Sequence, residues 1–91
     1  MKLETAHVRQ ILCKMLDSEL RSELSHRSDL ELSNTDLYHE LNLDSMDFEE
    51  MLAEVDYQFD ISVDCGDLKS SLFMEKPTVR NFIKVCNDCG Y

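Results

Sequence analysis

One serine lies where its hydroxyl could carry a covalently attached phosphate group. Ser45 follows Asp44 and precedes Met46 and Asp47, at the start of a stretch with apolar residues at helical spacing. Asp44 is a good helix N-cap and Asp47 completes a short capping box, so Ser45 is predicted to begin a helix. A phosphodiester on its oxygen would face unpaired N–H groups at the positive end of the helix dipole. Position alone is weak support, because most serines in a first helical turn only start the helix.

The helix that begins at Ser45 is predicted to end near Phe59-Asp60 and to bury one face. Five apolar side chains fall within one arc of roughly 100° on a helical wheel, namely Phe48, Met51, Leu52, Val55 and Phe59. The Ser45 hydroxyl is therefore predicted to point outward. The exposed face would hold Met46, Glu50, Ala53, Glu54 and Tyr57. Acidic positions on such a face are usually only solvated, although an apolar and an aromatic residue among acids favour a binding surface.

Two segments precede this helix in the sequence, and one has a helical pattern whereas the other has the pattern of a loop. Thr5 is predicted to cap a first helix that runs to about Leu24, with apolar residues every three or four positions. Residues 25–36 are polar and rich in turn formers, which predicts a loop. Four leucines are expected to anchor this region to the core, namely Leu30, Leu32, Leu37 and Leu41.

The C-terminal third is predicted to hold a short helix and a longer one. The short helix would begin at Asp67 and bury Leu68, Leu72 and Phe73. Pro77 then breaks the chain, and Thr78 would cap a last helix that buries Val79, Phe82, Ile83 and Cys86 and stops near Asn87 and Gly90. The predicted fold class is all-α, a small four-helix bundle of three main helices and one short helix.

Size and charge limit the function classes. Ninety-one residues favour one domain, 1–91, with a thin core that does not enclose a substrate. A net charge of −10 disfavours nucleic acid and anionic membrane and favours partners with basic patches. No apolar run is long enough to span a bilayer, and no signal-peptide pattern precedes the first helix. We therefore expect a cytoplasmic monomer with reduced cysteines.

Metal and enzyme chemistry are not expected. Cys86 and Cys89 have zinc-ligand spacing, but Cys13, Cys65 and three scattered histidines do not complete a four-ligand set. Calcium-loop frames that start at Asp56 or at Asp60 lack the glycine at position 6. No histidine is paired in the sequence pattern with a serine or cysteine nucleophile, so we expect no catalytic residue.

Three segments together resemble the acyl carrier protein family. Residues 41–48, Leu-Asn-Leu-Asp-Ser-Met-Asp-Phe, resemble the family's attachment motif, in which Asp-Ser-Leu or Asp-Ser-Met starts the second helix. Residues 57–63 resemble the family's exit from that helix, and Pro77-Thr78-Val79 resembles the opening of its last helix. The clear resemblance covers about residues 37–86. Asn42 stands where the family usually has glycine, and Glu49 where many fatty-acid carriers are apolar.

The resemblance implies a function and partners. Ser45 would receive 4′-phosphopantetheine from coenzyme A and carry acyl groups as thioesters for fatty-acid, polyketide or related lipid biosynthesis. Partners would be a phosphopantetheinyl transferase and acyl-transferring or chain-extending enzymes with basic docking patches. These would bind a face formed by Asp44, Met46, Asp47, Glu50, Ala53, Glu54 and Tyr57. The alternatives are a peptidyl or aminoacyl carrier, and an acidic helical interaction module with an unmodified Ser45.

Overall fold

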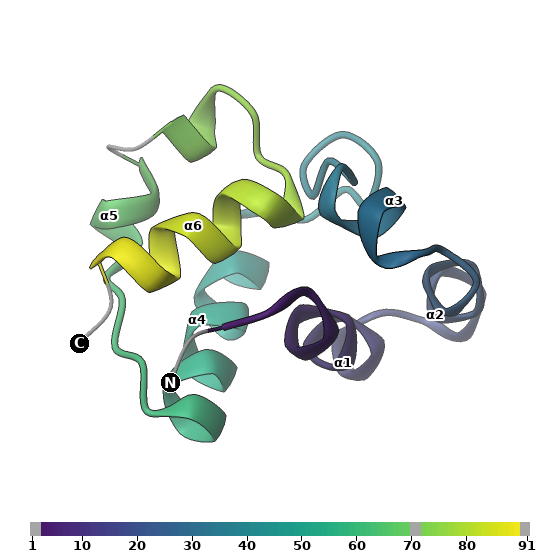
Figure 1. Ribbon diagram of the computed structural model, residues 1–91, viewed down its shortest axis with the longest axis horizontal. Helices are drawn as coiled ribbons and strands as arrows, with labels where there is room; N and C mark the ends of the chain where they lie inside the picture. The colour runs from purple at the N-terminus through teal and green to yellow at the C-terminus, as the bar shows by residue number, and fades with distance from the viewer. Residues whose placement is uncertain (1–2, 70–71, 90–91) are drawn as a thin grey trace.

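The computed structural model describes residues 3–69 and 72–89, and these residues form helices joined by loops (Figure 1). Within these ranges the elements are α1 (Thr5–Met15), α2 (Ser18–Ser25), α3 (Asp29–Ser33), α4 (Ser45–Phe59), α5 (Cys65–Lys69), the 3-10 turn η1 (Leu72–Met74) and α6 (Val79–Cys89). The same ranges contain no β-strand, only an isolated bridge between Asp36 and Thr78. The predicted all-α class is confirmed there, but with more helices than the four expected.

The predicted first helix is two helices. α1 ends at Met15, and α2 begins at Ser18 because the Asp17 carboxylate accepts a hydrogen bond from the Leu20 N–H at 3.0 Å. A strong cap in the middle of the pattern thus starts a new helix that the apolar spacing does not reveal. The cap of α1 is Glu4 rather than Thr5, and its N–H donates to His7 Nδ1 at 3.0 Å.

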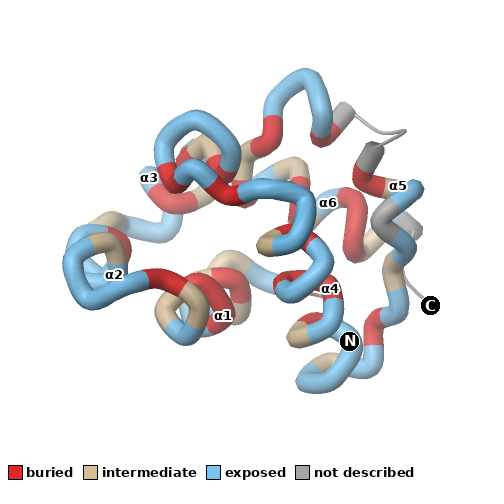
Figure 2. Tube along the Cα trace, turned by 180° about the vertical axis from the view of Figure 1, so that it is seen from behind, coloured by how far each residue is buried: buried red, intermediate tan, exposed pale blue. Residues whose placement is uncertain are grey.

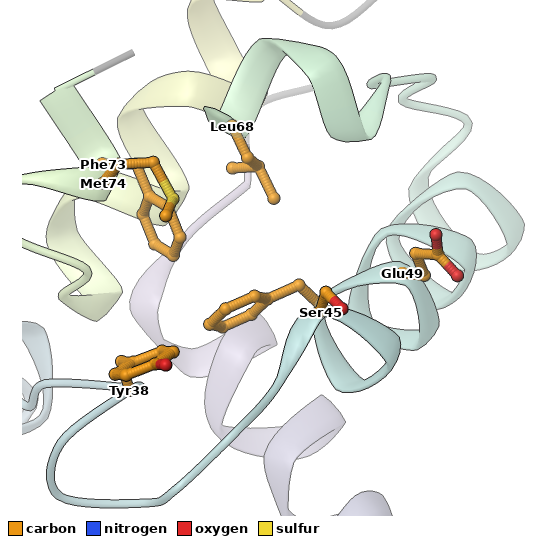
Figure 3. A pocket seen from close by; sticks show the side chains of 7 residues that line it. Tyr38, Ser45, Glu49, Leu68, Phe73 and Met74 are labelled. Carbon is orange, nitrogen blue, oxygen red and sulfur yellow. The ribbon is translucent and has the colours of Figure 1, made fainter. Parts of the chain in front are cut away.

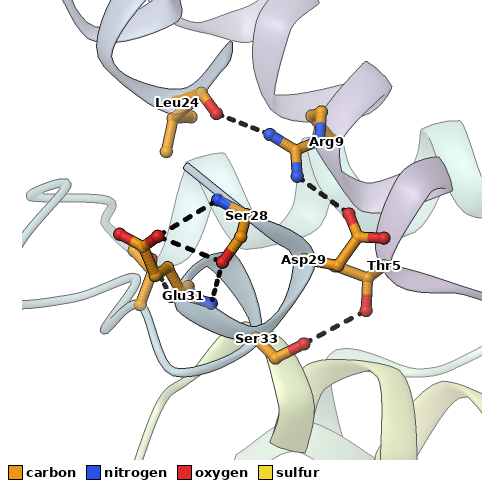
Figure 4. A network of polar contacts seen from close by, with 8 residues as sticks. Thr5, Arg9, Leu24, Ser28, Asp29, Glu31 and Ser33 are labelled. Carbon is orange, nitrogen blue, oxygen red and sulfur yellow. Dashed lines mark hydrogen bonds and ion pairs between the residues drawn. The ribbon is translucent and has the colours of Figure 1, made fainter. Parts of the chain in front are cut away.

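The region predicted as a loop, residues 25–36, contains α3. Its N-cap is Ser28, whose hydroxyl oxygen accepts from the Glu31 N–H at 3.2 Å and whose O–H donates to the Glu31 carboxylate at 3.1 Å (Figure 4). Leu30 is 67% exposed, so its prediction as an anchor is wrong, because the five-residue helix turns it to solvent. The other three predicted anchors are buried, namely Leu32, Leu37 and Leu41.

An arginine on α1 ties these added helices to the rest of the fold. Arg9 donates through Nη1 to the Leu24 carbonyl at 2.6 Å and through Nη2 to the Asp29 carboxylate at 2.9 Å (Figure 4). The Thr5 and Ser33 hydroxyls also contact each other at 3.2 Å. α1 therefore lies against both α2 and α3, and it also packs on α4 and α6.

α4 forms as predicted, from Ser45 to Phe59, and ends where Asp60 takes a left-handed conformation with φ 57°. Phe48, Met51, Leu52 and Val55 are buried in one core with apolar residues of α1 and α6. Figure 2 shows the buried residues alternating with exposed ones along each helix, as expected for amphipathic helices around a shared core. Phe59 is only half-buried and lies against the His7 ring, with centroids 4.4 Å apart.

The short helix begins earlier than predicted, whereas the last helix ends at Cys89, between the two predicted stop residues. α5 begins at Cys65, two residues before the predicted start, because the Asp67 carboxylate accepts from the Asp64 N–H at 3.3 Å. Asn87 lies inside α6 and does not stop it, since its side chain bonds the Leu3 backbone N–H and C=O at 2.8 and 3.1 Å. Gly90, the other predicted stop, lies outside the described residues.

The start of the last helix matches prediction. Thr78 Oγ1 accepts from the Asn81 N–H at 3.3 Å, which confirms Thr78 as the cap of α6. Of the predicted apolar face, Val79, Phe82 and Cys86 are buried and Ile83 is half-buried. In the described ranges, no helix is both long and apolar enough to cross a membrane.

Candidate functional site

Ser45 is the first residue of α4 and is exposed, as predicted. The capping box beside it is also confirmed: Asp44 Oδ1 accepts from the Asp47 N–H at 3.0 Å, and Asp47 Oδ2 accepts from the Asp44 N–H at 3.1 Å. These reciprocal bonds fix the backbone on both sides of Ser45. A group on the Ser45 oxygen would therefore start from a rigid helix end with the positive pole of the dipole beneath it.

The loop before Ser45 is fastened to the beginning of α6. The Leu37 N–H donates to the Pro77 carbonyl at 2.7 Å, and the Leu43 N–H donates to the Leu37 carbonyl at 3.1 Å. Leu37, Leu41 and Leu43 are all buried. Asn42 has φ 55°, so it adopts the left-handed conformation that glycine adopts most readily and asparagine tolerates. The approach to Ser45 is thus set by tertiary contacts as well as by the cap.

Asp36 organises the first turn of this loop. Its Oδ1 accepts from the Tyr38 and His39 N–H groups at 2.9 and 2.6 Å, and its Oδ2 lies 3.0 Å from His39 Nδ1. Burial raises the pKa of the Asp36 carboxyl, but the hydrogen bonds and the charge of His39, with the bond from Tyr38, together outweigh it. The net pKa lies below its ordinary value of 3.8. The charged carboxylate therefore holds the Tyr38 backbone, but not its side chain, in place.

A cavity of about 150 Å³ opens beside Ser45 (Figure 3). Its inner wall is formed by three buried apolar side chains, Phe48, Leu68 and Phe73, and its rim by the exposed Tyr38, Ser45, Glu49 and Met74. The Phe48 and Phe73 rings meet edge to face with centroids 5.4 Å apart. In Figure 3, Leu68, Phe73 and Met74 lie across the cavity from α4, and the Glu49 carboxylate is directed away from them.

The sequence predicts this serine but not which residues line the cavity. Phe48, Leu68 and Phe73 were expected only as core residues, and Tyr38 and Met74 had no predicted role. The lining comes from the loop before α4, from α4 itself, from α5 and from η1. No local pattern indicates that such distant segments meet, so only the tertiary structure reveals the cavity.

The predicted partner-binding face is largely exposed. Met46 is 74% and Tyr57 89% exposed, and Glu50 and Ala53 lie between them on the same side of α4. Asp44 is also exposed, whereas Asp47 is half-buried beside it. The structure therefore brings these residues together on one surface next to Ser45.

Glu54 differs from the other acids of this face. Its Oε2 accepts from Gln58 Nε2 at 2.6 Å and from Lys14 Nζ at 3.2 Å. The hydrogen bond from Gln58, followed by that from Lys14, lowers the pKa of Glu54. Since Lys14 offsets part of its charge, Glu54 should attract a basic partner less than the neighbouring Glu50 does.

The described residues contain no group of three or more histidine, cysteine or acidic side chains close enough to hold a metal ion. Cys13 is half-buried and Cys86 is buried. The side chains of Cys65 and Cys89 lie outside the described part of the structure. Of the three histidines, His26 and His39 are exposed, whereas His7 is half-buried against Phe59.

Comparisons with models of protein families, with curated proteins and with solved structures found no match to this chain.

Proposed function

We propose that this chain is an acyl carrier protein in which Ser45 is the attachment point of a 4′-phosphopantetheine arm. The observation that best supports the proposal is the position of an exposed serine at the capped start of α4, at the rim of an apolar cavity. The family resemblance of residues 37–86 implies the arm, and the apolar cavity beside Ser45 is compatible with a carrier that shelters its acyl group between helices. The arm would supply a terminal thiol that holds an acyl group as a thioester.

The residues around Ser45 fit a phosphate-linked group. The serine hydroxyl is accessible, and the Asp44–Asp47 capping box keeps the helix end formed without using the Ser45 side chain. The dipole of a 15-residue helix favours negative charge at this end. The negative charges of Asp44 and Asp47 would repel a phosphate group on Ser45. Each of their carboxylates, however, already accepts a hydrogen bond from a backbone N–H group. Ser45 therefore needs no rearrangement to be modified.

We further propose how the helices correspond to a carrier bundle. In this proposal α1, α4 and α6 are the three main helices and α5 with η1 is the short one, and α2 and α3 are additions between the first and second main helices. The contacts of α1 with α4 and α6, and of α5 with α4 and α6, are compatible with this arrangement. A cytoplasmic location remains part of the same proposal.

Partner enzymes would dock beside Ser45 on Met46, Glu50, Ala53 and Tyr57. An acidic chain with a net charge of −10 attracts cationic surfaces and accelerates encounter with them. Exposed ion pairs each contribute well under about 1 kcal/mol, so such complexes would be weak and short-lived. A carrier that must leave each enzyme after transfer requires weak complexes of this kind.

The test is incubation of the purified chain with coenzyme A and a broad-range phosphopantetheinyl transferase, followed by intact-mass measurement. The wild type should gain the mass of one arm, and Ser45→Ala should gain none. Ser62→Ala, which removes another exposed serine, is the matched control and should be modified like the wild type. Absence of modification in the wild type, or modification of Ser45→Ala, would reject the carrier function.

A second function is favoured by one observation, the exposure of Met46 and Tyr57 among acids. Such a face suits an interaction module that binds a basic partner without any arm. That alternative predicts an unmodified Ser45 in the mass experiment, together with a partner whose binding is weakened by Tyr57→Ala.

A further inference from the structure

A second cavity lies next to the one beside Ser45. It has a volume of about 220 Å³ and is lined by Tyr38, His39, Phe48, Met74 and Pro77. Tyr38, Phe48 and Met74 line both cavities. These three side chains therefore lie at the boundary between the space next to the serine and a larger space that also reaches His39 and Pro77.

Two of the three shared side chains are about half-exposed. Tyr38 and Met74 are each 52% exposed, whereas Phe48 is 8% exposed and packs on Phe73. Within the described residues, the Tyr38 hydroxyl has no hydrogen-bond partner, and its ring meets the exposed His39 ring edge to face with centroids 5.3 Å apart. Truncating Tyr38 or Met74 should therefore join the two cavities without opening the core, because neither side chain is part of it.

The first cavity is small compared with a long acyl chain. A protein cavity of about 150 Å³ binds benzene, which has six carbon atoms. Its buried wall is purely apolar, so it favours an uncharged hydrocarbon group over a polar one. A longer group could extend only past Tyr38 and Met74 or into solvent.

We propose that Tyr38 and Met74 are specificity-determining residues that limit the group held beside Ser45 to an uncharged hydrocarbon end of about six carbon atoms. This inference rests on the proposed function for its acyl group, but the size limit belongs to the cavity itself. The two requirements can therefore be tested separately, one on the unmodified chain and one on the loaded chain.

The first experiment uses the unmodified protein with benzene and naphthalene as probes, followed by the backbone amide NMR signals of Leu68 and Phe73. Benzene should shift these signals in the wild type, and naphthalene should bind more weakly despite its larger apolar surface. Met74→Ala and Tyr38→Ala should tighten naphthalene binding by about tenfold or more, because further ring carbons then leave water.

Two matched variants control for general effects of losing an exposed side chain. Met46→Ala and Tyr57→Ala remove an exposed methionine and an exposed tyrosine that line neither cavity. Both should leave the benzene and naphthalene affinities unchanged. The inference is overturned if benzene does not bind, if naphthalene binds the wild type as tightly as benzene, or if the control variants change the preference equally.

The second experiment loads Ser45 from acyl-coenzyme A donors with straight chains of four to twelve carbons. In the wild type the Leu68 and Phe73 signals should move with chain length up to about six carbons and then stay constant. In Met74→Ala the change should continue to longer chains. Signals that keep moving beyond about eight carbons in the wild type would overturn the size limit. If Ser45 accepts no arm, the proposed function fails, and the size limit is decided by the benzene and naphthalene titrations.

Discussion

Ser45 and Phe48 lie less than one helical turn apart on α4. Replacing Ser45 should prevent the proposed modification with little loss of stability, whereas replacing Phe48 should lower the stability of the fold. Ser45 is exposed and its hydroxyl makes no hydrogen bond within the described residues, so Ser45→Ala should change the free energy of unfolding by less than about 0.5 kcal/mol. Phe48 is 8% exposed and meets the Phe73 ring at 5.4 Å. Phe48→Ala should therefore cost about 3–5 kcal/mol.

Urea denaturation followed by circular dichroism measures both effects. Small domains have a total stability of about 5–15 kcal/mol, so Phe48→Ala can lose most of it. Phe48→Leu keeps an apolar side chain and should remain folded with a loss of about 1 kcal/mol or more. At this chain length each kcal/mol corresponds to about 4–8 °C in melting temperature, which is readily measured.

Phe59 supplies the internal comparison. Its ring is half-buried against His7, so Phe59→Ala should cost less than Phe48→Ala, although both were expected from sequence to be core residues. If Ser45→Ala proved less stable than Phe48→Leu, the orientation of α4 described above would be wrong. An equal loss for Phe48→Ala and Phe59→Ala would also contradict the burial of these rings.

Four further variants test the surroundings of Ser45. Asp44→Ala should lower the free energy of unfolding by about 0.5–2 kcal/mol in urea melts, since it removes the α4 cap; an unchanged value would show that the cap is not needed. Asp36→Asn should destabilise the chain at pH 7. Because the folded pKa of Asp36 is lowered, the carboxylate contributes fully above the ordinary value of 3.8 and loses that contribution as pH falls through the folded value. The difference from wild type in pH-dependent melts should therefore shrink below about pH 4, and a constant difference would contradict this role. Raising the salt concentration should slow arm transfer to Ser45 in a transferase assay. Glu50→Lys should slow the transfer more than Glu54→Lys does, because Lys14 already offsets part of the Glu54 charge. Equal transfer rates under all these conditions would show that this face does not attract the transferase.

The sequence predicted the elements whose signals are local. Asp44 and Asp47 specify the start of α4, the apolar stripe specifies its buried face, and Pro77 with Thr78 specifies the start of α6. Each of these signals acts within one helical turn or along one helix face. They were enough to place Ser45 on an exposed, capped helix end.

The remaining features depend on competition between signals or on tertiary contact. The Asp17 cap divides a continuous apolar pattern into two helices, and the short helix α3 forms in a polar segment because Ser28 and Glu31 cap it reciprocally. Tyr38 and Met74 meet at the cavity although 36 positions of sequence separate them. Such a meeting leaves no periodic trace in the sequence, so the cavity could not be predicted.

The most direct measurement is peptide-level mass spectrometry of the chain after co-expression with a phosphopantetheinyl transferase. The proposed function predicts one phosphopantetheine arm, found only on the peptide that contains Ser45, and its loss in Ser45→Ala. An unmodified Ser45 peptide alongside a modified control carrier, or an arm on a different serine, would contradict it.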